Sequence, residues 1–267
     1  MKRDVSAHLD VQVHAPTALE LQIAVARQAG VDLIESLRLT LDGRECVPSE
    51  ILGPHGTRLH RFDSGAGHLR VEYRATVLGA ALAEQASDYD LAVYLRPSRF
   101  VESDKLLGFA GAEFGCGIGD PEMAARVSSW VGRRIRYVPG SSDPVDGAVE
   151  TLLSGVGVCR DFSHLVVALL RAVGMPARVV SVYAPGCMPM DFHSVAEVYT
   201  NGGWQAFDPA GLAPRMSLVR IATGRDASDI AFLGNHGGDI TLNALSVNAT
   251  IDGPLPFDDL RQPAWIC

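Results

Sequence analysis

The stretch Gly155-Val-Gly-Val-Cys159-Arg-Asp-Phe-Ser-His164 decides how the rest of the chain is interpreted. Its small and flexible residues lead to a cysteine, and an apolar run from Leu165 to Val173 follows until Gly174. Such a run, ended by glycine, predicts a buried helix that begins close to Cys159. The positive end of a helix dipole favours the thiolate form of cysteine, which is the nucleophilic form. Cys159 is therefore a candidate catalytic nucleophile.

The composition limits the classes of partner. The chain has 267 residues, of which 47% are hydrophobic, and a formal net charge of −8. This length allows one large domain or two modest ones. The acidic balance argues against nucleic acid or an anionic membrane as partner, because both attract clusters of Lys and Arg. No apolar run approaches the roughly 20 residues that span a bilayer. The first residues also lack the apolar stretch of a signal peptide.

The cysteines indicate no shared structural site. The five are Cys46, Cys116, Cys159, Cys187 and Cys267. They are widely spaced and form no C-x-x-C pair, which supports neither a disulfide framework nor a structural zinc site. We therefore expect a reducing, cytoplasmic location and neither a metal nor another cofactor.

Residues 1–95 are predicted to form a β-rich domain. Apolar residues occupy alternate positions in four segments, at 9–13, 19–25, 37–41 and 69–77. A period of two is typical of strands with one buried face. Turn residues such as Asp42-Gly43 separate the segments,. Several short strands at this spacing predict a small antiparallel sandwich.

Residues 96–267 are predicted to form a second, catalytic domain of mixed helices and strands, so that the whole chain is of the α+β class. Asp120-Pro121 is a typical helix start,. The elements expected after it are a short helix at 146–153, the helix at Cys159, strands at 177–184, 193–200, 204–208 and 219–223, a helical turn at 226–233 and a strand at 240–251. Asn201-Gly-Gly203 predicts a hairpin between the second and third of these strands,.

Two residues of the predicted hairpin complete a candidate catalytic group with Cys159. His193 begins one strand and Asp208 ends the next. An imidazole takes the thiol proton and later returns it to the leaving amine. A carboxylate on the other ring nitrogen fixes the tautomer. The second strand is shorter than the first, so simple pairing does not place Asp208 opposite His193. An offset of a few residues or an intervening strand would be needed.

Other interpretations of these residues stay open at this point. Taken singly, a cysteine in an apolar helix, a histidine at a strand start and an Asp-Pro pair are usually structural. Cys187 could be the nucleophile, although no helix follows it, and Cys116 is interpreted as a bystander. Cys159, His164, His193 and Asp208 could instead bind a metal. His164 lies about 140° around the helix from the thiol, which favours His193 as the base.

Three segments together resemble the bacterial transglutaminase-like superfamily. They are Gly157-Val-Cys159-Arg-Asp-Phe-Ser-His-Leu, Asp191-Phe-His193-Ser-Val-Ala-Glu-Val-Tyr and Gly203-Trp-Gln-Ala-Phe-Asp208-Pro. The resemblance covers about residues 120–215. It implies a papain-like α+β core in which Cys159, His193 and Asp208 form a catalytic triad, with Asp208 reaching His193. Two positions depart from the family pattern: Ser194-Val195 replaces a tryptophan-containing pair, and Arg160 replaces a polar amide.

The resemblance leaves the reaction open, because the acyl-enzyme can pass to water or to an amine. We expect hydrolysis of an amide bond in a peptide or protein substrate. The alternatives are transfer to an amine, as in a protein-glutamine transglutaminase, and a non-catalytic binding protein with the same fold. Neither nucleic acid nor a membrane is an expected partner.

Overall fold

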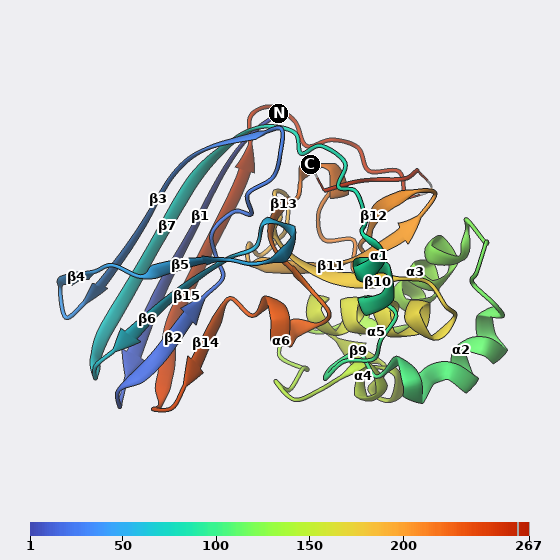
Figure 1. Cartoon of the computed structure of the whole chain (residues 1–267), viewed down its shortest axis with the longest axis horizontal. Helices are drawn as coiled ribbons and strands as arrows, with labels where there is room; N and C mark the ends of the chain where they lie inside the picture. Colours follow the sequence, from blue (N-terminus) through green and yellow to red (C-terminus); the bar gives the residue numbers. More distant parts are fainter. Residues whose placement is uncertain (261, 267) are drawn as a thin grey trace.

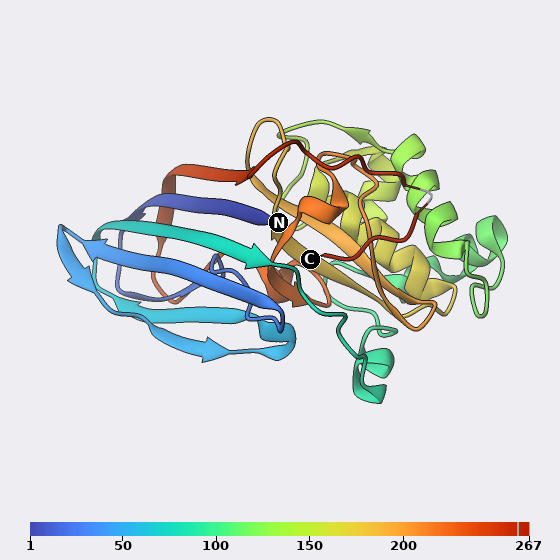
Figure 2. The ribbon, with the colours of Figure 1, turned by 90° about the horizontal axis from the view of Figure 1, so that it is seen from above.

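Alternating apolar residues place two antiparallel sheets face to face at one end of the molecule (Figures 1 and 2). The structure is a computed structural model that describes residues 1–260 and 262–266, so Cys267 lies outside the described residues. One sheet has the order β15 (Ile240–Ile251), β1 (Lys2–Val13), β7 (Gly67–Gly79), β3 (Val31–Leu41) and β4 (Arg44–Cys46). The other has the order β14 (Leu233–His236), β2 (Thr17–Leu21), β6 (Arg58–Ser64) and β5 (Ser49–Leu52). Side chains such as Leu9, Leu21 and Val71 fill the space between them.

A third antiparallel sheet forms the floor of the other half of the molecule. Its strand order is β12 (Gly203–Phe207), β11 (Phe192–Thr200), β10 (Ala177–Tyr183) and β13 (Val219–Gly224). The predicted hairpin is present: β11 and β12 pair from Thr200 with Gly203 to Ala196 with Phe207. Asn201 has a positive φ of 53°, which asparagine tolerates better than most residues,. The mixed fold with antiparallel sheets agrees with the predicted α+β class.

The helix that begins at Cys159 is α5 (Cys159–Ala172), and it packs against β10 and β11 (Figure 1). Its residues from Asp161 to Arg171 are all buried, which explains why its apolar character is almost continuous,. The other helices are α1 (Asp88–Val93), α2 (Leu107–Phe114), α3 (Met123–Arg134), α4 (Ala148–Ser154) and α6 (Ala227–Ile230). Within the described part of the chain, no helix is long and apolar enough to cross a membrane.

Short elements complete the chain. Strands β8 (Arg136–Tyr137) and β9 (Val156–Gly157) pair in parallel beside the start of α5. The 3₁₀ helices in the described residues are η1 (Pro54–Gly56), η2 (Ser103–Leu106) and η3 (Arg215–Ser217). The helix expected at Asp120-Pro121 begins at Met123, because Asp120 accepts a hydrogen bond from the Glu122 N–H in a turn before it. Strand β6 was not predicted, because Arg58 and His60 occupy two of its buried positions and hide the alternation.

The two last strands of the chain lie in the sandwich. Strand β15 pairs with β1 over its whole length, from Arg3 with Ile251 to Val13 with Ile240. Strand β14 pairs with β2 in the other sheet. Both strands belong to the segment predicted as the second domain, 96–267, yet they hydrogen-bond to strands of 1–95. The division at residue 95 stays a prediction, and the chain crosses between the two halves again after β13.

A buried ion network joins the sandwich to the third sheet. Arg178 of β10 is 0% exposed and Glu197 of β11 is 1% exposed. The Arg178 Nε donates to Glu197 Oε2 at 2.8 Å, and Arg220 of β13 donates to the same oxygen at 2.9 Å. Arg178 also donates to Glu84 of the connector at 2.6 Å, and its Nη1 lies 3.2 Å from the ring Nδ1 of His55 in η1, between β5 and β6 of the sandwich. Because charges at such depth are stable only when paired, the network holds the halves in one arrangement.

Candidate active site

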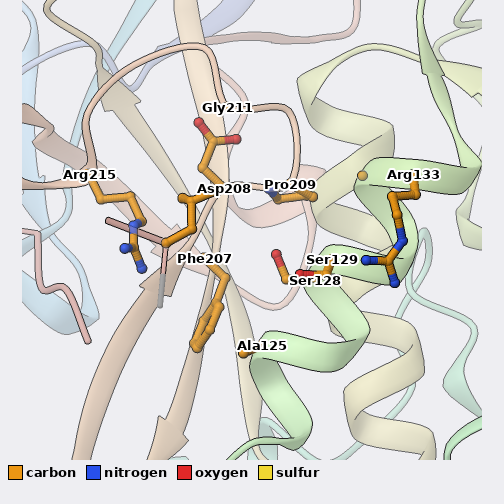
Figure 3. A pocket seen from close by; sticks show the side chains of 11 residues that line it. Ala125, Ser128, Ser129, Arg133, Phe207, Asp208, Pro209, Gly211 and Arg215 are labelled. Carbon is orange, nitrogen blue, oxygen red and sulfur yellow. The ribbon is translucent and has the colours of Figure 1, made fainter. Parts of the chain in front are cut away.

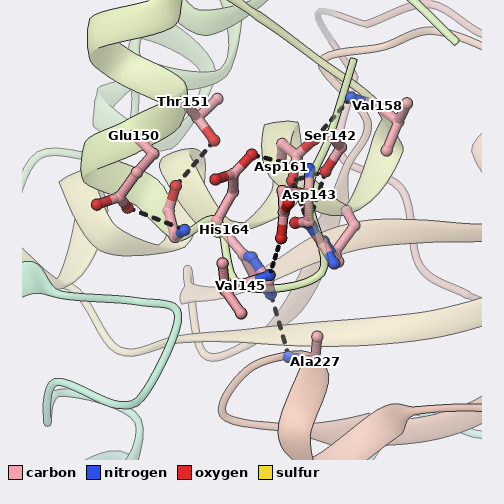
Figure 4. Close-up of polar contacts among 12 residues, drawn as sticks. Ser142, Asp143, Val145, Glu150, Thr151, Val158, Asp161, His164 and Ala227 are labelled. Carbon is pink, nitrogen blue, oxygen red and sulfur yellow. Dashed lines mark hydrogen bonds and ion pairs between the residues drawn. The ribbon is translucent and has the colours of Figure 1, made fainter. Parts of the chain in front are cut away.

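Cys159 is the first residue of α5, and the loop before it is fixed by the side chain of Asp161 (Figure 4). The Asp161 Oδ2 accepts from the Val158 N–H at 2.9 Å, and its Oδ1 accepts from the Ser142 hydroxyl at 2.9 Å. A Cβ on Gly157 would lie 2.8 Å from the Asp161 Cβ, so the backbone can approach this closely only as glycine,. The thiol is therefore held at the positive end of a rigid helix.

His193 and Asp208 are brought together as predicted from the resemblance. His193 Nε2 lies 2.8 Å from Asp208 Oδ2, and both side chains are buried. Continuing the hairpin register beyond Phe207 would place Asp208 opposite Val195, two residues from His193 and on the same face. A diagonal pair of this kind is within reach of long side chains. Asp208 also accepts from the backbone N–H groups of Ala210 and Leu212, which fixes its orientation.

The other ring nitrogen of His193 is left for the thiol. Its Nδ1 is buried and makes no hydrogen bond of ordinary geometry to the described residues. Cys159 lies beside the ring, and both residues line one cavity. Burial opposes a charge on His193, but the Asp208 carboxylate and the Cys159 side chain outweigh it and hold the pKa of His193 well above its usual value,. This environment favours the protonated imidazolium form of His193.

Tyr137 is a residue of this site that the sequence did not indicate. It pairs with Gly157 in the parallel β8–β9 contact, and its ring centroid lies 5.9 Å from that of Phe162 on α5. Burial and the neighbouring Cys159 and Cys187 raise the pKa of Tyr137, and the Cys159 backbone N–H close to its hydroxyl opposes part of this rise. No local pattern marks this tyrosine, because the contact depends on pairing between segments 20 residues apart.

None of the remaining candidates hydrogen-bonds to His193 or Asp208 in the described part of the chain. The Cys187 thiol is buried and donates to the Pro189 carbonyl at 3.4 Å, and burial raises its pKa. Cys116 is exposed. His164 is fully buried, which lowers its pKa to about 3, and its Nε2 accepts from the Ala227 N–H at 3.1 Å (Figure 4). Over residues 1–260 and 262–266, no three His, Cys, Asp or Glu side chains could together hold a metal ion.

Two cavities flank the catalytic group. The first, of about 320 Å³, contains Cys159 and His193 in its lining and continues between the third sheet and the sandwich. The second, of about 260 Å³, lies beyond Asp208. Figure 3 shows it with Arg133 of α3 on one side and Arg215 on the other. Because only the first contains the thiol, it is the candidate substrate site.

The comparisons with known proteins agree with this geometry. Residues 117–209, which include Cys159, His193 and Asp208, match the model of the transglutaminase-like superfamily. The crystal structure of a candidate cysteine protease from Cytophaga hutchinsonii has a TM-score of 0.87 and 30% sequence identity, over 97% of this chain and 94% of that one. The chain belongs to the transglutaminase-like superfamily.

Curated relatives of this transglutaminase-like chain occur in mycobacteria. A protein of Mycobacterium leprae is 24% identical over 146 residues, which is 51% of this chain and 52% of the relative. A protein of Mycobacterium tuberculosis is 32% identical over 124 residues, 41% of this chain and 40% of the relative. These matches span about half or less of the length of the curated relatives.

The two departures from the family pattern lie beside the thiol in the transglutaminase-like core. The Arg160 Nη2 donates to the Ser142 hydroxyl and to the Asp143 carbonyl, each at 2.6 Å. Ser194 is buried and lines the first cavity. Arg160 therefore stabilises the loop before α5, and Ser194 leaves space in the cavity.

Proposed function

We propose that this transglutaminase-like chain is a cysteine-dependent acyl-transfer enzyme that hydrolyses an amide bond in a peptide or protein. The observation that carries the proposal is His193, with Asp208 at its Nε2 and Cys159 beside its other edge, at the start of α5. An imidazole that is oriented by a carboxylate and adjoins a thiol is the arrangement that nucleophilic catalysis requires. The 30% identity to a candidate cysteine protease supports the same class.

The acylation step follows from these positions. The Cys159 sulfur attacks the amide carbon and forms a C–S bond, while the thiol proton resides on His193 Nδ1. The C–N bond then breaks, and His193 passes that proton to the leaving amine. Asp208 stabilises the imidazolium throughout and keeps the ring in place. The product of the step is a thioester at Cys159.

The deacylation step uses the same groups in reverse. His193 takes a proton from water, and the resulting hydroxide attacks the thioester carbon. The C–S bond breaks, the acid is released, and the thiol and imidazole return to their first state. If a primary amine takes the place of water, the product is a new amide, which is the transglutaminase reaction.

Two donors are available for the oxyanion of both steps. The backbone N–H of Cys159 stands at a helix N-terminus, where it has no partner within the helix. The Tyr137 hydroxyl adjoins this N–H and is the second donor in our proposal. A carbonyl oxygen that enters between them would accept from both.

A screen of amide and ester substrates with and without an added primary amine tests the proposal. Release of the acid without amine incorporation supports hydrolysis, and incorporation of the amine supports transfer. Labelling with iodoacetamide tests the nucleophile separately. A Cys159 that reacts no faster than Cys116 and Cys187 would contradict catalysis and favour a binding protein.

The cytoplasmic location stays a prediction that depends on the spacing of the cysteines. Cys46, Cys116, Cys159 and Cys187 are all free thiols in the structure. A reducing compartment would keep Cys159 in the form that the proposed reaction needs. Fractionation of cells that express the chain would test this prediction.

A further inference from the structure

The cavity at Cys159 has an apolar wall that comes largely from outside the sheet that carries His193. The apolar side chains in its lining are Phe192, Ile221, Ile230, Phe232, Leu233 and Leu245. Leu233 belongs to β14 and Leu245 to β15, so both sheets of the sandwich contribute. The charged lining residues, Arg160, Asp191 and His193, are within two positions of a catalytic residue or are themselves catalytic. The polar end of the cavity therefore coincides with the proposed chemistry.

The segment between β13 and β14 is fixed over this cavity by contacts from both halves of the molecule. From the sandwich side, Gln22 donates its Nε2 to the Asp229 carbonyl at 3.1 Å and its backbone N–H to the Phe232 carbonyl at 3.1 Å. From α5, His164 accepts from the Ala227 N–H at 3.1 Å. Because burial keeps His164 neutral, it can accept this hydrogen bond at any pH near neutrality,. Hydrogen bonds from both halves of the molecule therefore hold this wall of the cavity in place.

Aromatic stacking extends the wall to the catalytic base. The rings of Phe192 and Phe232 are stacked with centroids 5.2 Å apart, and the ring centroid of Tyr183 lies 5.5 Å from that of Phe192. Phe192 immediately precedes His193 in β11. Phe192 and Phe232 both line the cavity, so a group that enters it would contact this aromatic surface. A charged side chain in contact with this aromatic wall would lose hydration without gaining a partner among the wall residues.

The size of the cavity fits a large side chain. Its volume is about 320 Å³, whereas an apolar cavity of about 150 Å³ is enough to bind benzene. We propose that this cavity, formed jointly by the third sheet, the 225–233 segment and strands β14 and β15, is a specificity pocket for a large apolar side chain of the acyl donor, such as phenylalanine or leucine. The inference deepens the proposed function and rests on it for the identity of the acyl donor.

Binding measured without turnover tests the pocket. In a Cys159→Ala background, we expect N-acetyl-phenylalaninamide and N-acetyl-leucinamide to bind about 10- to 100-fold more tightly than N-acetyl-glycinamide in NMR titrations, because their side chains leave water. Equal dissociation constants for the three amides would overturn the inference, whatever the activity of the wild-type chain.

Filling the cavity provides the matched test. Leu245→Trp should reduce the preference for phenylalanine over glycine to less than about threefold, whereas Leu242→Trp, at a side chain of β15 that is 38% exposed and does not line the cavity, should leave it unchanged. A preference that survives Leu245→Trp in a protein with a normal melting temperature would overturn the assignment. If Leu245→Trp does not fold, Phe232→Ala is measured in its place, and an undiminished preference would again contradict the pocket.

Hydrolysis of matched chromogenic amides separates this inference from the proposed function. The values of kcat/KM should follow the same order, phenylalanine and leucine far above glycine and aspartate. Hydrolysis of all the amides without a preference among them would contradict the pocket and still support the proposed enzyme. Tight binding of the apolar amides without turnover of any would keep the pocket and count against hydrolysis.

Discussion

His193 Nε2 and Asp208 Oδ2 lie 2.8 Å apart, although the two residues belong to different strands and are separated by 15 positions. The hairpin brings them close, and the side chains then reach diagonally across it,. The contact leaves the Nδ1 of His193 for Cys159. The proposed triad therefore depends on the register of one hairpin.

Removing the charge of Asp208 should disable the base. Asp208→Asn is expected to lower kcat by roughly 10⁴-fold, because the amide no longer fixes the tautomer or stabilises the imidazolium. Steady-state amide hydrolysis measures the change, and Asp32→Asn, at an exposed position of β3, serves as the control. A loss below tenfold for Asp208→Asn would count against its role.

The same substitution should also change stability with a defined pH dependence. The pKa of His193 is raised in the folded state, so its stabilising contribution is complete below the ordinary histidine pKa and is lost as the pH rises through the raised value,. Asp208→Asn should therefore reduce the free energy of unfolding most at pH 5 to 6 and less at alkaline pH. Urea denaturation across this range measures it, and a pH-independent difference would contradict the linkage.

Cys159 should be essential for turnover and dispensable for the fold. Cys159→Ala removes the nucleophile, and we expect loss of detectable hydrolysis with an unchanged circular dichroism spectrum. Cys187→Ala is the matched variant, because Cys187 is buried close to the same site but donates to the Pro189 carbonyl. If Cys159→Ala kept its activity, or if only Cys187→Ala lost it, Cys187 would be assigned as the nucleophile in place of Cys159.

Tyr137 should act on the transition state more than on substrate binding. Loss of one oxyanion donor typically lowers kcat by about 10²- to 10³-fold, so Tyr137→Phe should reduce kcat strongly with little change in KM. Tyr89→Phe, at a side chain that is 73% exposed on α1, is expected to have no effect. Equal activity of the two variants would exclude the Tyr137 hydroxyl as a donor.

Helix α3 packs close enough to Pro209 to position Asp208. A Cβ on Gly132 would lie 2.8 Å from the Pro209 carbonyl oxygen, whereas one on Gly111 of α2 meets nothing within 4 Å. Gly132→Ala should therefore displace the neighbour of Asp208 and lower activity and stability together. Gly111→Ala should stabilise the chain by about 0.5–1 kcal/mol. Thermal unfolding and kcat of both variants test this, and a harmless Gly132→Ala would contradict the close contact.

Glu197, at the junction between the two halves, should make the stability of the chain sensitive to acid. Burial alone would raise the pKa of Glu197, but the charges of Arg178 and Arg220 outweigh the effect of burial and lower this pKa to about 2. Its contribution is therefore present above about pH 4.5 and lost as the pH falls toward 2. Glu197→Gln should destabilise the chain by about 3–5 kcal/mol at pH 7, because it leaves buried arginines unpaired.

Urea denaturation at pH 7 and pH 3 compares Glu197→Gln with the wild type, and the difference should shrink at the lower pH. Glu72→Gln, at an exposed position of β7, should change stability by less than about 0.5 kcal/mol. A Glu197→Gln variant as stable as Glu72→Gln at pH 7 would show that the network contributes little.

The sequence predicted those parts of the protein that depend on local patterns. Each of these patterns involves residues that are close to one another in the sequence. They are the apolar run after Cys159, the turn at Asn201-Gly202-Gly203 and the alternation in β1 and β7. A helix start and a hairpin are decided at this range, because their hydrogen bonds join near neighbours. The α+β class and the superfamily follow from these elements and from the three motifs.

Tertiary structure alone decided what surrounds Cys159. Tyr137 reaches the thiol through pairing with Gly157, and Leu245 reaches the cavity because β15 pairs with β1 more than 200 residues away. Register between distant strands depends on which whole faces fit together and not on the periodicity of either strand. The candidate nucleophile could therefore be predicted from its own segment, whereas the walls of the proposed substrate pocket could be seen only in the folded chain.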